Sequence, residues 1–387
     1  MSQSDRTPPH DRAADHWDVV VIGGGIAGVS VAYELAPDVT VLLLDMEDTL
    51  GFHATGRSAA MFLETYGGPD IRAFTVASRP FLVDPPAAFE SRLLSPRGLL
   101  QVARPGRGWV VEKLFDDVRD VVADVRLVDE AEARVLCPVL REDVIEVGLY
   151  EPSAMEMDVD ALHQGYVRGF RSRGGSVRRG ARVDELVPAP HGWDVRLGDG
   201  SSLAATTIVD AAGAWADRIA VTAGVRPVGL TPRVRTAFTT AAPDGVAVDR
   251  LPFLYDVDES FYAKPEGDQM LCSPADRTPS EPVDARPDTT EIARSLDEIR
   301  EMTTIPARSV RASWAGLRTF SPDDNLVIGA DPDVSGFFWL AGQGGYGVQT
   351  APALARFAAA SIRGVEPPAD VLALGLRPDR ISPGRFR

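Results

Sequence analysis

The sequence is poor in the residues that build disulfide frameworks and metal centres. Its 387 residues include only two cysteines, Cys137 and Cys272, which lie far apart and form no C-x-x-C pair. The five histidines share no metal-ligand spacing such as H-E-x-x-H. We therefore expect no metal site, and two reduced thiols of the kind found in cytoplasmic proteins.

Basic residues and long apolar runs are also scarce. The chain has 40 Lys and Arg against 56 Asp and Glu, a net charge of −16, which disfavours nucleic-acid binding. The charge-free stretch 19–33 is shorter than the roughly 20 residues that cross a bilayer, so we expect no membrane span. Residues 1–16 are polar and lack the pattern of a secretory signal, which predicts a disordered tail.

A strand, a glycine-rich turn, a helix and a second strand follow one another near the N-terminus. Residues 18–22 are apolar and β-branched, which predicts a buried parallel strand. Residues 23–28 match G-x-G-x-x-G, residues 29–35 predict a helix, and residues 39–44 predict another apolar strand. This order is typical of a dinucleotide-binding unit.

Each part of such a unit has a physical task. Gly23 permits the tight turn, Gly25 lets the backbone approach a pyrophosphate, and Gly28 lets the helix pack closely on the strand. Free N–H groups at the helix start attract phosphates. Asp45, at the end of the second strand, is expected to accept hydrogen bonds from a ribose. The alternative is a turn that only packs a strand on a helix, and these residues do not decide which dinucleotide binds.

Three further segments combine glycine or other small residues with a turn. Residues 51–60 form a hydroxyl-bearing turn suited to a flat cofactor and its phosphates. Residues 208–216 run from a strand into a small-residue turn, and residues 342–350 form a glycine-rich turn before an Ala-rich helix over 351–362. Together with the first unit, they resemble the FAD-dependent D-amino-acid oxidase superfamily, which includes glycine and sarcosine oxidases.

The resemblance is closest to the bacterial D-arginine dehydrogenase type of D-amino-acid dehydrogenase. It extends from about residue 17 to the C-terminus and includes the runs D-A-L-H-Q-G-Y (160–166), D-E-S-F-Y (258–262) and W-A-G-L-R (314–318). It implies non-covalently bound FAD and a mixed α/β (α+β) fold. In that fold a Rossmann-like FAD-binding domain is interleaved with an antiparallel-sheet substrate domain.

The family architecture also implies how the chain is divided. The FAD-binding domain is expected to use residues 17–85, 151–224 and 311–387, and the substrate domain residues 86–150 and 225–310. Local patterns predict strands over 98–103, 176–187, 193–197 and 234–240, a helix between Asp158 and Gly174, and a helix over 289–303.

The resemblance assigns FAD contacts to the turns and to the strand ends beside them. The expected contacts are Gly23, Gly25, Ile26, Ala27, Gly28, Asp45, Met46, Thr55, Gly56, Arg57, Ser58, Ala59, Ala60, Val183, Ala212, Gly213, Trp215, Gly316, Gly344, Gly345, Tyr346, Gly347, Val348 and Gln349.

Oxidation of an amino acid by a flavin needs few protein groups, because the flavin itself takes a hydride from the α-carbon. An arginine can hold the substrate carboxylate through two parallel hydrogen bonds. The resemblance places this clamp at Arg318, a second arginine at Arg235, and a hydroxyl that reaches the carboxylate at Tyr262. The alternatives are surface charges for the arginines and a packed strand aromatic for the tyrosine.

Other residues match positions around the substrate in the same family. Tyr66 matches a tyrosine on a mobile lid, Gly345 a position whose carbonyl meets the substrate amine, and Gln349 a residue beside it near the flavin. A loop aromatic and helix packing are the alternatives for Tyr66 and Gln349. His53 lies in the expected flavin-contact loop, and His163, on an amphipathic helix, is expected to be structural.

Two pocket positions depart from the D-arginine type. Leu99 stands where that type has an acidic residue paired with the guanidinium, and Met61 where it has a histidine. A guanidinium buried beside these side chains would be unpaired. We therefore expect a D-amino acid with an apolar or neutral side chain, oxidised to an imino acid that hydrolyses to a 2-oxo acid and ammonia.

Several alternatives remain open at this point. The preference for D over L rests on the resemblance alone. The substrate can instead be an N-alkyl or cyclic amino acid or a biosynthetic amine, and a non-catalytic FAD-binding subunit is a third hypothesis. The electron acceptor can be a quinone, a carrier or oxygen.

Overall fold

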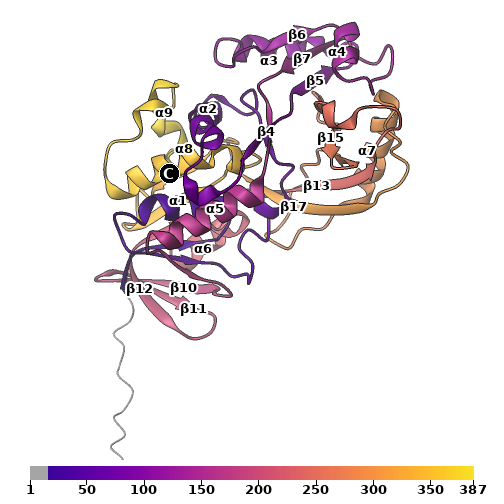
Figure 1. Cartoon of the computed structure of the whole chain (residues 1–387). Coiled ribbons are helices and arrows are strands. Elements are labelled where there is room, and N and C mark those ends of the chain that lie inside the picture. Colours follow the sequence, from indigo (N-terminus) through magenta and orange to yellow (C-terminus); the bar gives the residue numbers. More distant parts are fainter. Residues whose placement is uncertain (1–15) are drawn as a thin grey trace, which may run out of the picture.

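The structure is a computed structural model that describes residues 16–387. The predicted tail over 1–16 lies outside the described residues, apart from His16, which begins the first strand. Most of the described chain is divided between two large sheets and the helices packed on them (Figure 1).

The first sheet contains the predicted dinucleotide-binding unit. Its strand order is β10-β11-β12-β1-β2-β9, with β19 pairing β12 and β18. Strands β12, β1, β2, β9 and β19 run parallel. The bounds are β1 (His16–Ile22), β2 (Val41–Leu44), β9 (Ser176–Arg178), β10 (Val183–Ala189), β11 (Gly192–Leu197), β12 (Ser202–Asp210), β18 (Val327–Ala330) and β19 (Phe337–Ala341).

Helices from distant parts of the chain pack on this sheet. Apolar side chains of α1, α2, α5 and α8 form one hydrophobic core with β1 and β2. The helix bounds are α1 (Ile26–Leu35), α2 (Pro69–Val83), α5 (Val159–Ser172), α6 (Ala216–Thr222), α8 (Gly347–Arg363), α9 (Ala369–Ala373) and α10 (Pro378–Ile381).

The second sheet has the order β17-β13-β16-β15-β14-β5-β7-β6 and is antiparallel except where β14 pairs with β5. It lies to the right of and above α1 and α5 in Figure 1. The bounds are β5 (Leu99–Ala103), β6 (Arg126–Val128), β7 (Val147–Glu151), β13 (Thr231–Ala241), β14 (Phe253–Asp256), β15 (Tyr262–Glu266), β16 (Gln269–Ser273) and β17 (Ala312–Phe320). Helices α3 (Gly108–Val118), α4 (Glu130–Leu136) and α7 (Thr289–Met302) accompany it.

A small third sheet joins β3 (Met61–Phe62), β8 (Met155–Met157) and β4 (Leu94–Pro96). The mixed α/β fold with an antiparallel second sheet is confirmed. Two details differ from the predictions. The strand expected over 176–187 is two strands, because the chain turns between them with Gly180 in the left-handed region at φ +60°.

The second difference concerns β17, which falls within the segment 311–387 that we assigned to the FAD-binding domain. Its residues Ala312–Phe320 pair with β13 along its whole length, so the strand belongs to the second sheet. An edge strand of this kind carries no sequence signal for its partner, because pairing between distant strands depends on the whole fold.

Candidate active site

A cavity of about 520 Å³, here called the large cavity, opens at the carboxyl ends of β1, β2 and β12. Ligands in parallel α/β sheets bind at this edge. The predicted contacts that line it are Gly23, Gly25, Ile26, Ala27, Asp45, Met46, Thr55, Ser58, Val183, Ala212, Gly213, Trp215, Gly344, Gly345, Gly347 and Val348.

The glycine turn has little room for any side chain. Gly23 has φ +108°, and a Cβ added there would lie 2.4 Å from the carbonyl oxygen of Ala211. A Cβ on Gly28 would lie 1.8 Å from the carbonyl oxygen of Gly23, so the close packing of α1 on the turn requires glycine. The N–H of Ile26, which begins α1, donates to Thr55 Oγ1 at 3.0 Å.

The side chains of Asp45 and His163 form hydrogen bonds with the backbone of this turn. The Asp45 carboxylate accepts hydrogen bonds from the N–H of Gly24 at 2.5 Å and of Glu47 at 2.7 Å, and burial raises its pKa. His163, buried on α5, lies 2.9 Å from the carbonyl oxygen of Gly24. Burial lowers the pKa of His163, so the neutral ring donates its Nε2–H to that oxygen. The ribose contact of Asp45 stays a prediction.

Five predicted contacts do not line the large cavity or the smaller one described below: Gly28, Gly56, Arg57, Gly316 and Tyr346. Arg57 is the clearest case, because its guanidinium donates to Asp284 Oδ1 at 2.6 Å and to the carbonyl oxygen of Ala315 at 2.8 Å. It therefore ties the turn at residues 51–60 to the second sheet and to the loop before α7.

Sequence reasoning missed several residues that line the large cavity. They include Glu47, Phe52, Ala181, Arg182, Ala211, Arg218, Ile219, Thr222, Leu317 and Gln343, whereas His53, expected in the flavin-contact loop, does line the cavity. Most are direct neighbours of motif residues, which was the available signal. His53 Nε2 lies 2.9 Å from Glu47 Oε1, and its ring packs on Trp215 with centroids 4.6 Å apart. Gln343 Nε2 is buried without a hydrogen-bond partner within residues 16–387.

These features fit a dinucleotide. The cavity is large, glycines make room for a close approach of pyrophosphate, and the N-terminus of α1 supplies N–H groups. The unpaired Gln343 Nε2 in its wall offers a further hydrogen-bond donor.

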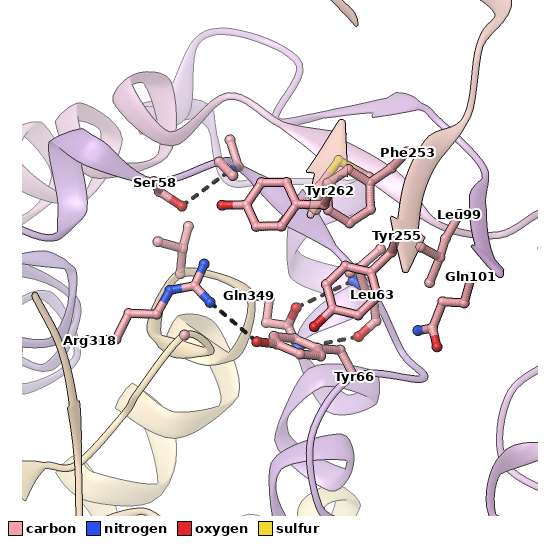
Figure 2. A pocket seen from close by; sticks show the side chains of 15 residues that line it. Ser58, Leu63, Tyr66, Leu99, Gln101, Phe253, Tyr255, Tyr262, Arg318 and Gln349 are labelled. Carbon is pink, nitrogen blue, oxygen red and sulfur yellow. Dashed lines mark hydrogen bonds between the residues drawn. The ribbon is translucent and has the colours of Figure 1, made fainter. Parts of the chain in front are cut away.

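A second, smaller cavity of about 50 Å³, here called the small cavity, adjoins the large one (Figure 2). Ser58, Arg318, Gly345 and Val348 line both. The small cavity brings together most of the predicted substrate residues: Met61, Tyr66, Leu99, Tyr262, Arg318, Gly345 and Gln349, with Ala59 and Ala60 beside them. Leu63, Gln101, Phe253 and Tyr255 also line it and were missed.

Arg318 on β17 is the one charged side chain among the described residues that line the small cavity. Its Nη1 donates to the hydroxyl of Tyr66 at 3.3 Å. Burial disfavours its charge, but the phenol groups of Tyr66, Tyr262 and Tyr255 outweigh that cost and raise its pKa, so it stays a cation. A Cβ on Gly345 would lie 2.8 Å from Arg318 Nη1, so a side chain at that position would require the guanidinium to shift.

Arg235 is not among the residues that line the small cavity. It lies on β13 opposite Gly316 and is only 8% exposed. Its Nε is buried without a partner in the described part of the chain. The structure therefore places Arg235 beside the strand that carries Arg318 but not in the cavity wall, and its contact with substrate stays a prediction.

The segment before Tyr66 is held from two sides. Gln349 on α8 exchanges hydrogen bonds of 3.3 Å with the N–H and carbonyl of Leu63. Glu151 at the end of β7 accepts from the N–H of Glu64 at 2.9 Å and from Thr65 Oγ1 at 2.6 Å. Complete burial raises the pKa of Glu151 to about 7. The predicted mobility of a Tyr66 lid stays untested.

Comparison with known proteins identifies the family to which this chain belongs. The sequence model of the DAO family, described as FAD dependent oxidoreductase, matches residues 18–361. The chain therefore belongs to this family, and its cofactor is FAD.

Individual relatives and structures agree with this assignment. The mitochondrial dimethylglycine dehydrogenase of Mus musculus is 27% identical over 401 residues, which cover 96% of this chain and 45% of that protein. The chain thus spans about half the length of this relative. A glycine oxidase structure from Geobacillus kaustophilus aligns with a TM-score of 0.81 and 21% identity, over 94% of this chain and 99% of that one. An iminodiacetate oxidase structure from Chelativorans sp. BNC1 aligns with a TM-score of 0.78 and 22% identity, over 94% and 98%.

None of the helices in the described part of the chain is both long and apolar enough to cross a membrane. Residues 16–387 also contain no group of three or more His, Cys, Asp or Glu side chains arranged to hold a metal ion.

Proposed function

We propose that this protein oxidises small α-amino acids of the D series with an apolar or neutral side chain, using non-covalently bound FAD. The observation that carries the proposal is the position of Arg318, a single cation in a small cavity that opens onto the large cavity. Guanidinium and carboxylate form two parallel charge-assisted hydrogen bonds. An α-amino acid held in this way would direct its α-carbon towards the large cavity, where FAD would bind.

The chain's own groups would bind and orient the substrate. Arg318, Tyr66 and Tyr262 would hold the carboxylate, and the carbonyl of Gly345 would accept a hydrogen bond from the amine. FAD supplies the redox chemistry, since it accepts the hydride that leaves the α-carbon. The amine gives up a proton, and water then hydrolyses the imino acid to a 2-oxo acid and ammonia. The electrons pass to a quinone, a carrier or oxygen.

The residues expected around the substrate side chain support the proposed preference for neutral D-amino acids over D-arginine. Leu99 and Met61 both line the small cavity, and no acidic side chain of the described residues does. A buried guanidinium would have no counter-charge there, which is costly.

The proposal can be tested by anaerobic bleaching of the flavin. The purified holoenzyme is mixed with D- and L-amino acids, and flavin absorbance is followed by stopped flow. We expect neutral D-amino acids to reduce the flavin faster than their L forms and faster than D-arginine and D-lysine. Faster reduction by the L forms or by D-arginine would contradict it.

Substitution of the anchor gives the second arm of the test. Arg318→Leu should lower the rate of flavin reduction by about 100-fold or more while FAD stays bound, because two hydrogen bonds to a charged group are lost. Arg196→Leu is the matched control, since Arg196 lies on the surface of β11 in an ion pair with Glu185. Equal rates for Arg318→Leu and the unaltered enzyme would remove the basis of the proposal.

An N-alkyl amino acid is a second candidate. The similarity to a dimethylglycine dehydrogenase favours it, as do the aromatic rings of the small cavity. Tyr255 and Tyr262 are stacked with centroids 6.2 Å apart, and aromatic faces attract methylated ammonium groups. Sarcosine and N,N-dimethylglycine therefore belong in the bleaching series. Reduction by these compounds alone would select this candidate. Reduction by none of the amino acids would leave a flavoprotein with a specialised substrate, such as a biosynthetic amine, or a non-catalytic FAD-binding subunit.

A further inference from the structure

The small cavity has a polar group that the carboxylate clamp does not use. Gln101 on β5 lines it, and Figure 2 shows this side chain on the opposite side of the pocket from Arg318. The resemblance that gave the other pocket residues pointed to position 99 and gave no role to position 101.

The register of β5 sets the direction of this side chain. Side chains alternate between the two faces of a strand, so Leu99 and Gln101 share one face. Both line the small cavity, whereas Leu100 and Val102 belong to the hydrophobic core on the other face. In the neighbouring strands, Gln101 pairs with Tyr255 of β14 and Leu149 of β7, which holds its backbone on both sides.

The amide of Gln101 is open to the small cavity and has no hydrogen-bond partner among residues 16–387. The residue as a whole is only 7% exposed. The contrast with Gln349 is informative, because that amide bonds to Leu63 and to Thr75 Oγ1 and is thus occupied by the protein. The amide of Gln101, in contrast, is free to donate to and accept from a ligand in the small cavity.

The surroundings of Gln101 define the chemistry of that ligand. The neighbouring wall consists of Leu99, Met61 and Phe253, together with the hydroxyl-bearing Tyr255. No charged side chain of the described residues lines this end of the cavity, so a substrate carboxylate or ammonium would lie there without a counter-charge. A primary amide both donates and accepts, which suits an uncharged hydroxyl or carboxamide.

We infer that Gln101 is a specificity-determining residue that binds a neutral hydrogen-bonding group on the substrate side chain, a hydroxyl or a carboxamide. This inference rests on the proposed function and narrows it. An apolar side chain of the same shape would cover the amide without bonding to it, and a site built to form a hydrogen bond rejects the analogue that lacks the group.

Isosteric substrate pairs test the inference. D-Asparagine and D-leucine have the same branched shape, as have D-threonine and D-valine, and they differ in hydrogen-bonding groups. Stopped-flow reduction of the holoenzyme should favour the polar member of each pair by about 10- to 100-fold, the range expected when one buried polar group is left unpaired. In Gln101→Leu that ratio should fall to one or below.

Controls separate recognition from general damage. The methyl group of D-alanine does not extend to Gln101, so Gln101→Leu should lower the rate of flavin reduction by D-alanine far less than the rate with D-asparagine. Gln164→Leu, on α5 away from both cavities, is the matched variant and should keep the substrate preference. Gln101→Met keeps the length of the side chain without its hydrogen bonds. It replaces Gln101→Leu as the test variant if the leucine variant loses FAD.

The outcomes distinguish this inference from the proposed function. If amino acids reduce the flavin but the polar-to-apolar ratio is the same in the enzyme and both Gln101 variants, the inference is wrong and the function stands. If apolar members are preferred by the unaltered enzyme, the inference is also wrong. If no amino acid reduces the flavin, the proposed function fails and the inference fails with it.

Discussion

Gly345 influences the position of the Arg318 side chain because it has no side chain of its own. An added Cβ would lie 2.8 Å from Arg318 Nη1 and 3.2 Å from the hydroxyl of Tyr66. The backbones of both residues are held in place, that of Arg318 by strand pairing and that of Tyr66 by the hydrogen-bonded segment before it, so an added carbon atom would push on the two side chains themselves. The present position of the guanidinium therefore depends on the absence of that carbon atom.

Gly345→Ala should displace the guanidinium and slow flavin reduction by about 100-fold, since a misplacement of about 1 Å has effects of that order. FAD content should be little changed. Gly68→Ala is the control, because a Cβ there meets no atom within 4 Å and its φ is −73°. Stopped-flow reduction checks both variants, and an unchanged rate in Gly345→Ala would show that Arg318 can move aside.

Residues that belong to a local motif could be predicted from the sequence, and residues placed by distant strand pairing could not. Gly23, Gly25 and Asp45 stand in one continuous unit whose spacing carries the information. Gln101 and Tyr255 meet only because β5 pairs with β14, across more than 150 residues of chain. No local pattern reports such a pairing.

At the scale of elements, the segment that leads to Tyr66 is joined to two different parts of the fold. Gln349 of α8 binds Leu63, and Glu151 of β7 binds Glu64 and Thr65. Glu64 in turn pairs with Arg79 of α2 at 2.7 Å. Because β7 belongs to the second sheet and α8 packs against the first, this short segment is a connection between them.

The carboxyl group of Glu151 makes this connection sensitive to pH. Its pKa in the folded protein is about 7, above the ordinary value of 4.5. The folded state therefore binds a proton more tightly than the unfolded state, and stability from this group is lost as pH rises from about 4.5 to about 7. The loss is on the order of 3 kcal/mol, since each pKa unit corresponds to about 1.4 kcal/mol.

Glu151→Gln should remove this dependence, because the amide cannot ionise. Relative to the unaltered protein, the variant should gain unfolding free energy on the order of 2–3 kcal/mol between pH 5 and pH 8. Glu112→Gln, at an exposed position of α3, should show no such gain. The free energy of unfolding of each FAD-saturated protein is measured with denaturant at both pH values. The difference between variant and unaltered protein is then compared, because the titration of all other groups cancels in it. A constant difference between the two proteins would contradict the assigned pKa.

At the scale of the molecule, the large cavity is built from segments that lie far apart in sequence. Its lining runs from Ile22 through residues 181–222 to Val348. The interleaved arrangement was predictable from the family resemblance, but the place of β17 in the second sheet was not, because its residues were assigned by their position in the chain. FAD bound in this cavity would contact all three segments, so we expect it to stabilise the folded arrangement as a whole.

Removal of FAD should lower the melting temperature, and re-addition should restore it in a concentration-dependent way. A ligand that binds only the folded state at 100 times its Kd stabilises by about 2.7 kcal/mol. FMN is the matched control, because it lacks the adenylate half that would lie towards Asp45 and should restore less. Scanning calorimetry of the stripped protein with each flavin gives the comparison, and equal restoration by FMN would show that the adenylate end of the cavity contributes nothing.

The wall that the two cavities share has a thermodynamic consequence. Ser58, Arg318, Gly345 and Val348 face both spaces, so whatever fills one space changes the surface that the other ligand meets. Linkage is reciprocal: if a carboxylate that cannot be oxidised tightens the binding of FAD by some factor, FAD tightens the binding of that carboxylate by the same factor. Carboxylic acids that resemble the substrate should therefore slow the loss of FAD during dialysis. The affinity for FAD should be highest while the small cavity is occupied.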